Sequence, residues 1–138
     1  MPNSFAEIYL HFVWTTWDRQ ELITPPIEPK LYAAIAAKCL ELRSQVIEIG
    51  GVEDHVHVLV RIPAAISPSE VAKGLKGASS HFVTHVLGEK SFKWKGSFGV
   101  LSVSPNQITK VREYIRNQKQ HHGSGNTHAR WERDTEDE

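Results

Sequence analysis

Apolar and β-branched residues gather in four short runs along the chain, and such runs predict β-strands. The four runs are residues 8–16, 46–52, 55–62 and 98–103. Gly50 and Gly51 predict a kink or bulge at the end of the second run. Between the runs, apolar residues recur at helical spacing over about 28–43 and from Pro68 to about Leu87. Ser67 and Glu70 have the spacing of a capping box at the start of the second helix, in which Val71, Leu75, Phe82 and Val86 would face inward. The order βαββαβ predicts an α+β fold, with a ferredoxin-like antiparallel sheet covered by helices.

One additional helix is predicted at the C-terminal end, over about 105–122. Ser104 and Gln107 have the spacing of a capping box, and Pro105 suits the first helical position. Gly123 is a typical residue just past a final turn. This extra helix would carry Tyr114 beside a stripe of apolar residues.

The composition supports a single domain with a sizeable core, because the chain has 138 residues of which 40% are hydrophobic. We assign that domain to residues 1–122 and expect the acidic tail, 123–138, to be poorly ordered. Cys39 is the only cysteine, which excludes an internal disulfide and favours a small core residue. Since no long apolar segment is present, we expect a cytoplasmic protein without a membrane span.

The formal net charge is zero, yet residues 61–119 hold ten Lys or Arg against three Asp or Glu. A basic segment of this kind can follow a phosphate backbone, although a solvated basic face is an equally good interpretation. The residues that we expect to contact DNA are Lys73, Lys76, Lys93, Lys95, Lys110, Arg112, Arg116 and Lys119.

Two histidines stand one residue apart in the third predicted strand. His55 and His57 would share a face of the strand, because side chains alternate with a period of two. Imidazole is the commonest transition-metal ligand, so this spacing supplies half of a metal site. Two packed core histidines would give the same pattern.

A tyrosine and an amide lie four residues apart in the last predicted helix. Tyr114 and Gln118 would project together from one helical face. Taken alone, the pair also fits a tyrosine at the edge of a core and a solvated glutamine.

Together, these motifs resemble the single-tyrosine HUH transposases of the insertion-sequence-two-hundred-like family, whose relatives include the REP-associated tyrosine transposases. Residues 9–16 look like that family's first strand, and residues 50–60 look like its Gly-Gly-x-x-Asp-His-x-His strand pair. Residues 75–80 resemble its second helix, and residues 114–118 resemble its nucleophile helix. Trp17-Asp18-Arg19-Gln20 departs from the basic stretch of better-known members.

The resemblance implies a metal-dependent transposase that cuts and rejoins single-stranded DNA. His55, His57 and Gln118 would hold Mg²⁺ or Mn²⁺, and Tyr114 would form a 5′-phosphotyrosine. The implied partner is a hairpin end of a mobile element. The resemblance also implies a homodimer with shared active sites, in which the histidines of one chain meet the tyrosine of the other.

Two other classes of protein remain open at this point. The chain could be a ferredoxin-like nucleic-acid-binding module whose tyrosine stacks on a base. It could also be a domesticated regulator that binds palindromic hairpins without transposing.

His11 could orient a metal ligand or contact DNA, or it could be a core histidine. Glu53 and Asp54 could add a carboxylate, although turn solvation is the more usual role.

Overall fold

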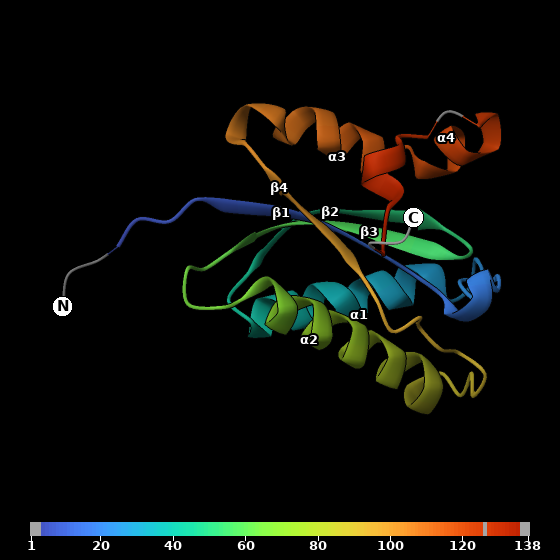
Figure 1. The fold of residues 1–138 in the computed structure, drawn as a ribbon. Helices are drawn as coiled ribbons and strands as arrows, with labels where there is room; N and C mark the ends of the chain where they lie inside the picture. The colour runs from blue at the N-terminus through green and yellow to red at the C-terminus, as the bar shows by residue number, and fades with distance from the viewer. Residues whose placement is uncertain (1–3, 126, 136–138) are drawn as a thin grey trace.

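A computed structural model describes residues 4–125 and 127–135. Four strands form one antiparallel sheet (Figure 1), namely β1 (Ile8–Thr15), β2 (Gln45–Val52), β3 (His55–Ile62) and β4 (Gly99–Val103). Their order across the sheet is β2-β3-β1-β4, with every neighbouring pair antiparallel. The α+β fold with a ferredoxin-like order of strands is therefore confirmed.

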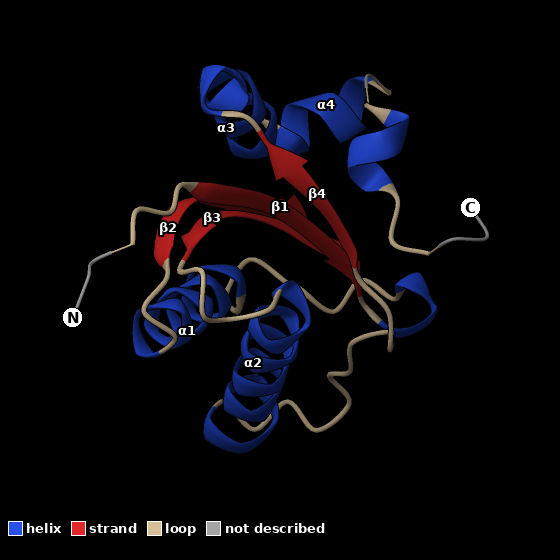
Figure 2. Ribbon diagram, turned by 60° about the vertical axis from the view of Figure 1, so that its left-hand side comes forward, coloured by secondary structure: helices blue, strands red, loops and turns tan. Residues whose placement is uncertain are grey.

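Helices cover both faces of the sheet (Figure 2). On one face lie α1 (Glu28–Glu41) and α2 (Pro68–His81), which connect the strands of the sheet. On the other face lie α3 (Ile108–Arg116) and α4 (Gln118–Ser124). Among the described residues, the helices are too short or too polar to cross a membrane.

The main core lies between the sheet and the pair α1 and α2. Because side chains alternate along a strand, every second residue of β1 and β3 points into this layer. Removing a large apolar side chain from water contributes about 1.5–3 kcal/mol, so these positions dominate the stability of the domain. Those with the least exposure include Phe12, Trp14, Val56, Val58, Val60, Leu31, Ile35, Cys39 and Leu75.

Helix α2 begins as its sequence predicts and ends differently. The Ser67 hydroxyl accepts from the Glu70 N–H, and the Glu70 carboxylate accepts from the Ser67 N–H, which is a complete capping box. A π-helical segment, Phe82–Val86, follows α2. Its wider turn rotates the buried face, so Val83 is buried while Val86, expected to face inward, is 65% exposed.

The C-terminal helix that we expected over 105–122 is interrupted. A 3₁₀ turn (Pro105–Gln107) precedes α3, and Asn117 separates α3 from α4 with φ −101° and ψ 28°. The capping box does not form, because the Ser104 hydroxyl pairs with Asn106 Oδ1 instead. The tyrosine and the glutamine therefore lie on two short helices that meet at a bend.

Close contact between α3 and the sheet depends on Gly50. A Cβ atom added there would overlap the carbonyl oxygen of Ile115. We expected a kink or bulge at Gly50 and Gly51, but the irregular pairing of β2 falls between Val46 and Glu48. Gly50 instead provides room, which lets the helix that carries Tyr114 rest directly on β2.

Part of the tail, which we expected to be poorly ordered over residues 123–138, packs on the sheet. Within the described residues, Ala129–Glu132 forms a 3₁₀ helix, η4, and Asp134 is 1% exposed. The Thr15 hydroxyl donates to Asp134 at 3.1 Å. A Cβ at Gly99 would overlap the carbonyl oxygen of Arg133, so the tail lies directly against β4. Residues 126 and 136–138 of the tail lie outside the described residues.

Candidate metal and nucleophile site

Strand β3 places both of its histidines on the face opposite the main core. His55 and His57 are 1% and 0% exposed, and they alternate with valines that point toward α1 and α2. Their rings lie 5.2 Å apart between centroids. The two side chains thus share one face of the strand, as the period-two pattern predicted, and this face is the one covered by α3, α4 and the tail.

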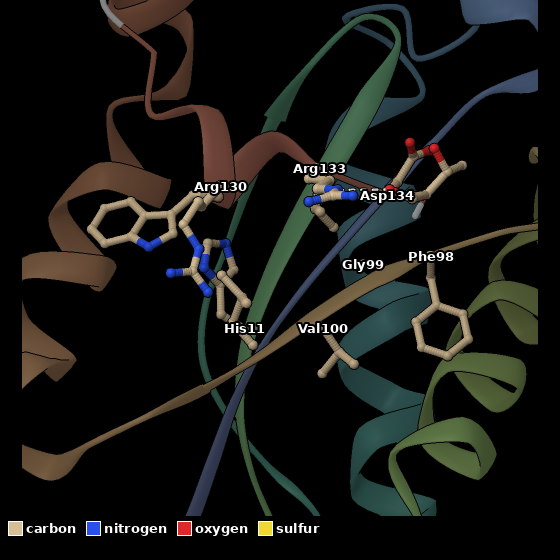
Figure 3. Close-up of a pocket in the computed structure, with 11 residues that line it drawn as sticks. His11, Phe98, Gly99, Val100, Arg130, Arg133 and Asp134 are labelled. Atoms are coloured by element: carbon tan, nitrogen blue, oxygen red, sulfur yellow. Dashed lines mark hydrogen bonds between the residues drawn. The ribbon is translucent and has the colours of Figure 1, made fainter. Parts of the chain in front are cut away.

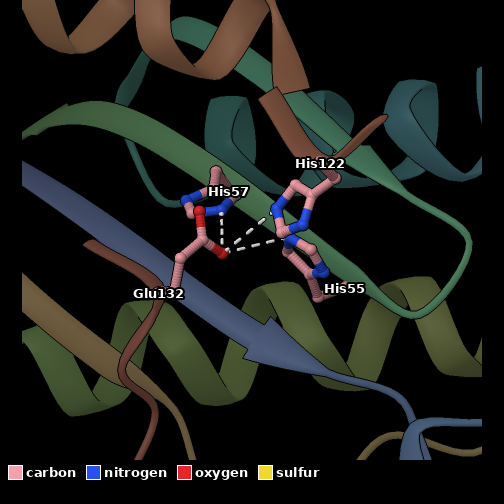
Figure 4. A group of neighbouring side chains, drawn as sticks. All are labelled: His55, His57, His122 and Glu132. Atoms are coloured by element: carbon pink, nitrogen blue, oxygen red, sulfur yellow. Dashed lines mark hydrogen bonds and ion pairs between the residues drawn. The ribbon is translucent and has the colours of Figure 1, made fainter. Parts of the chain in front are cut away.

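The outer ring nitrogens of the two histidines converge on one point (Figure 4). His55 Nε2 lies 3.2 Å and His57 Nε2 lies 3.1 Å from the same carboxylate oxygen, Glu132 Oε1. Gln118 Oε1 lies 3.1 Å from His55 Nε2 and 3.0 Å from His122 Nε2. The predicted set of His55, His57 and Gln118 is therefore brought together in one cluster.

The cluster contains two residues that the sequence analysis did not assign. One donor atom from each of His55, His57, His122 and Glu132 lies within 4.8 Å of the others. His122 follows His121 on the polar side of the last helix, so helical spacing from Gln118 could have suggested it. Glu132 carries no comparable local signal, because it arrives from a tail 75 residues beyond His57.

The donor set fits a divalent transition metal. Imidazole nitrogens with amide and carboxylate oxygens suit Mn²⁺ and its neighbours in the series. Metal-bound histidines usually pair their other ring nitrogen with a hydrogen-bond partner. Here His55 Nδ1 lies 2.7 Å from Asp54 Oδ1, and His57 Nδ1 lies 2.8 Å from His11 Nε2. Both Nδ1 atoms are thus hydrogen-bonded, and both Nε2 atoms point toward the position of Glu132 Oε1.

Charge in the cluster is concentrated on one histidine and one carboxylate. Burial opposes a charge on His55, but hydrogen bonds to Asp54 and Glu132 outweigh it and raise the pKa of His55 to about 9. Burial lowers the pKa of His57, with only partial compensation by Glu132. Burial opposes ionisation of Glu132 as well, yet hydrogen bonds from His55 and His57 hold its pKa well below the ordinary value.

Tyr114 lies beside this cluster and is 7% exposed. Its hydroxyl donates to Glu132 Oε2 and accepts from the backbone N–H of His128 at 3.0 Å. Its ring stacks on His121 with centroids 4.7 Å apart and meets Trp131 edge-on at 4.9 Å. Burial and the bond to Glu132 raise the pKa of Tyr114 to about 12, so the phenol is protonated in this arrangement.

The bend at Asn117 sets the relation between the tyrosine and the glutamine. Gln118 is 1% exposed, and its amide N–H donates to the Tyr114 carbonyl oxygen at 3.3 Å. Its amide oxygen is thereby directed to His55 and His122. The tyrosine and the amide do share one side of the C-terminal helices, but the amide is fixed by a backbone contact rather than solvated.

Most of the basic residues expected to contact DNA have partners within the protein. Several pair within the protein: Lys76 Nζ donates to the carbonyls of Lys95 and Ser97, Arg112 and Arg116 contact Glu48, Lys119 contacts Glu28, and Lys95 lies 3.5 Å from Asp134. Lys93 lies over the ring of Trp17 at 4.1 Å. Lys110 lines a cavity of about 360 Å³ with Tyr114 and His128. Lys73 lies on α2, across the sheet from this cavity.

This geometry defines a class of protein. Its members have a ferredoxin-like sheet that carries a histidine pair, and a C-terminal helix that brings a tyrosine to that pair. A family model described as "Transposase IS200 like" matches residues 4–118. The chain therefore belongs to the IS200-like transposase family. A search of curated proteins found no match.

Solved structures of low sequence identity share the fold. A protein from Deinococcus radiodurans R1, described as a candidate transposase, is 20% identical with a TM-score of 0.71, over 86% of this chain and 95% of that one. A REP-associated tyrosine transposase bound to a REP hairpin is 16% identical with a TM-score of 0.63, over 92% of this chain and 74% of that one. The resemblance stated from the motifs is thus confirmed.

Proposed function

We propose that this chain cuts and rejoins single-stranded DNA, with Tyr114 as the nucleophile and a divalent metal held by His55, His57 and Gln118. The observation that carries the proposal is the meeting of the phenol and the two imidazoles on one carboxylate, that of Glu132. A scissile phosphate offers two oxygens in a similar arrangement. The convergence of these groups supports a site that holds a phosphate between the nucleophile and the metal ligands.

The covalent step is an exchange of phosphate esters. The Tyr114 oxygen bonds to phosphorus as the bond from phosphorus to the 3′ oxygen breaks. The phenol loses its proton and the leaving 3′ oxygen gains one, which yields a 5′-phosphotyrosine and a free 3′-hydroxyl. A bound Mg²⁺ or Mn²⁺ would supply Lewis-acid stabilisation of the phosphate. Because the phosphotyrosine retains the free energy of the broken phosphodiester bond, a second strand can be joined by the reverse exchange.

Glu132 must leave its place before this exchange can occur. Its carboxylate fills the space between the Tyr114 hydroxyl and both His Nε2 atoms. The tail segment that carries it therefore has to shift when DNA enters. Trp131 and His128, whose rings stack at 4.1 Å, would move with it.

The proposed substrate is a hairpin end of a mobile element. The hairpin-bound REP-associated relative of similar fold supports this choice. Lys110, at the cavity beside Tyr114, is well placed for a phosphate near the cut. Aromatic rings around the same cavity suit an unpaired base.

The test uses a labelled single-stranded hairpin oligonucleotide, the protein and Mn²⁺, followed by denaturing electrophoresis. We expect a protein-linked oligonucleotide with the parent protein and none with Tyr114→Phe, whose hairpin binding stays within a few-fold. Tyr9→Phe is the matched control, because Tyr9 packs against Arg61 near the other end of β1. Adduct that persists in Tyr114→Phe would contradict the proposed nucleophile.

A hairpin-binding protein without cleavage activity is the second candidate function. The engaged Tyr114 hydroxyl and its raised pKa of about 12 favour it. The same experiment distinguishes the two, because a binder shifts the DNA in a native gel and gives no covalent product under denaturing conditions.

A homodimer with shared sites stays a prediction. One chain already places the rings of Tyr114 and His57 5.8 Å apart, so each chain has the parts of a complete site. Mixing His57→Ala protein with Tyr114→Phe protein decides between the arrangements once subunit exchange is demonstrated. Adduct on the His57→Ala chain would show sharing, and a mixture without adduct would show that each chain uses its own tyrosine.

A further inference from the structure

His57 is held at both ring nitrogens, and its side chain has no contact with solvent. Nε2 lies 3.1 Å from Glu132 Oε1, and Nδ1 lies 2.8 Å from His11 Nε2. The exposed fraction of His57 is 0% and that of His11 is 2%. Every hydrogen-bonding role of the His57 ring is therefore set by these two neighbours.

The Glu132 carboxylate and a metal ion require opposite protonation states of His57 Nε2. An ionised carboxylate only accepts hydrogen bonds, so Nε2 must carry a proton when it contacts Glu132. A metal takes the lone pair, so Nε2 must be bare when it binds an ion. A neutral imidazole has one ring proton, which then has to be on Nδ1. The partner of Nδ1 must therefore donate in one state and accept in the other.

His11 can play both roles. A neutral imidazole has one donor and one acceptor nitrogen, whereas a carboxylate or carbonyl would only accept and a lysine would only donate. Burial, reinforced by the neighbouring His57, lowers the pKa of His11 to about 3, which keeps its ring neutral. The ring also lines a cavity of about 340 Å³ together with Arg130 and Asp134 (Figure 3). Water in a cavity of that size can pair with the remaining His11 nitrogen in either state.

His55 provides an internal contrast. Its Nδ1 faces the carboxylate of Asp54 at 2.7 Å, an acceptor whose role is fixed. His55 therefore keeps its Nδ1 proton with or without an ion. Only the inner partner of His57 is a group that can reverse its role.

We infer that His11 is a positioning residue whose ring lets His57 alternate between a hydrogen bond to Glu132 and coordination of a divalent metal. On metal entry, the Nε2 proton of His57 leaves toward Glu132, and the Nε2 proton of His11 moves along the 2.8 Å hydrogen bond to His57 Nδ1. His11 Nδ1 takes up a proton that cavity water relays from solvent, and the proton received by Glu132 returns to solvent as the tail shifts, so that protons are neither created nor consumed. Each ring ends with one proton, so neither ring changes its charge. The inference rests on the proposed function, because it takes His57 as a metal ligand.

The first test is a Mn²⁺ titration of the parent protein and of two variants, by calorimetry or by the electron paramagnetic resonance of free Mn²⁺. His11→Phe keeps an aromatic ring and has no partner for Nδ1, so we expect Mn²⁺ affinity to fall about 10–100-fold. His11→Gln can turn its amide to donate or accept, so we expect affinity within a few-fold of the parent. Tyr9→Phe, on the same strand, is the control.

The second test reads the protons directly and needs no variant. Ring ¹⁵N chemical shifts of His57 should show Nε2 protonated in the metal-free protein and Nδ1 protonated after addition of diamagnetic Zn²⁺. The ring shifts of His11 should move in step, from Nε2 protonated to Nδ1 protonated, whereas a purely structural role for His11 would leave its own tautomer unchanged. The inference is overturned if Nδ1 is protonated in both states, or if folded His11→Phe binds Mn²⁺ as tightly as the parent.

Failure of this inference is distinguishable from failure of the proposed function. A tyrosine adduct without a proton switch would remove only the role of His11. A proton switch and Mn²⁺ binding without any adduct would remove strand cleavage and keep the role of His11. A parent protein that binds neither metal would overturn both.

Discussion

The two faces of the sheet are made from alternate residues of the same strands, yet they differ in chemistry. On β3, Val56 and Val58 enter a layer of apolar side chains closed by α1 and α2, whereas His55 and His57 enter a layer of hydrogen-bonded polar groups. On β1, Phe12 and His11 divide in the same way. A substitution on the apolar face is therefore expected to change stability without changing the site, whereas a substitution on the polar face changes the site directly.

The two layers also differ in how far along the chain their partners lie. The apolar layer is closed by helices that immediately precede or follow the strands. The polar layer is closed by α3, α4 and η4, and Glu132 contacts a histidine 75 residues earlier. Short-range patterns therefore describe the apolar layer well, while the polar layer depends on contacts between distant segments.

The largest expected effect is on the polar face, where His57→Ala should abolish metal-dependent adduct formation. Loss of a ligand should exceed the ~100-fold typical of an outer partner. Because His57 is fully buried and bonded at both nitrogens, we also expect a loss of about 1–3 kcal/mol in unfolding free energy. His81→Ala, an exposed histidine on α2, is the control for both measurements. Normal cleavage by His57→Ala would remove the metal assignment.

On the apolar face, Phe12→Ala should destabilise the protein by about 3–5 kcal/mol, because the ring is fully buried in the main core. Denaturant unfolding measures the loss. Under conditions where the variant remains folded, Mn²⁺ affinity should be unchanged. Phe5→Ala, at a position 83% exposed, should leave stability within about 0.5 kcal/mol. A change in metal affinity for folded Phe12→Ala would show that the two faces are coupled.

Gly50→Ala probes the contact between α3 and β2. The new methyl group would overlap the Ile115 carbonyl, so α3 must move away from β2, at a cost of about 1–3 kcal/mol. Since α3 carries Tyr114, adduct formation should fall more than Mn²⁺ binding does. Gly77→Ala is the matched control, because nothing lies within 4 Å of the added Cβ, and it should stabilise α2 by about 0.5–1 kcal/mol. Equal effects from both glycines would contradict the close-packing argument.

The smallest expected effect concerns the tyrosine hydroxyl in Glu132→Ala. Glu132 helps to raise the pKa of Tyr114 to about 12, so its removal should bring that pKa down toward the ordinary value near 10. The phenolate fraction at a given pH then rises, and adduct should form faster with its pH dependence moved to lower pH. Ultraviolet titration of the tyrosine and the cleavage rate measure the two shifts. Exposed Glu113→Ala is the control. A slower rate would identify Glu132 as a needed ligand.

The sequence predicts the sheet well, because period-two patterns and turn residues are local. The pattern predicts the third strand at residues 55–62, as observed, and the α2 capping box forms from Ser67 and Glu70. The break at Asn117 was missed, since nothing in the residues around it interrupts the helical pattern. The outward turn of Val86 was missed for a similar reason, because a π-helical segment shifts the face without any glycine or proline.

For the site, His55, His57, Gln118 and Tyr114 could be selected from spacing and resemblance, and the structure brings them together. Their roles in metal binding and catalysis remain predictions. Glu132 could not be selected, because a carboxylate in an acidic tail looks like a solvated residue until the tail is seen to pack on β4. The expected basic surface is also less uniform than its charge suggests, since Arg112 and Arg116 both contact Glu48.

The late position of Glu132 in the chain has a consequence for the newly made protein. Synthesis proceeds from the N-terminus, so the strands, both helices of the apolar layer and Tyr114 all leave the ribosome before η4 does. The cluster of His55, His57, His122 and Glu132 can thus be completed only after most of the chain has left the ribosome.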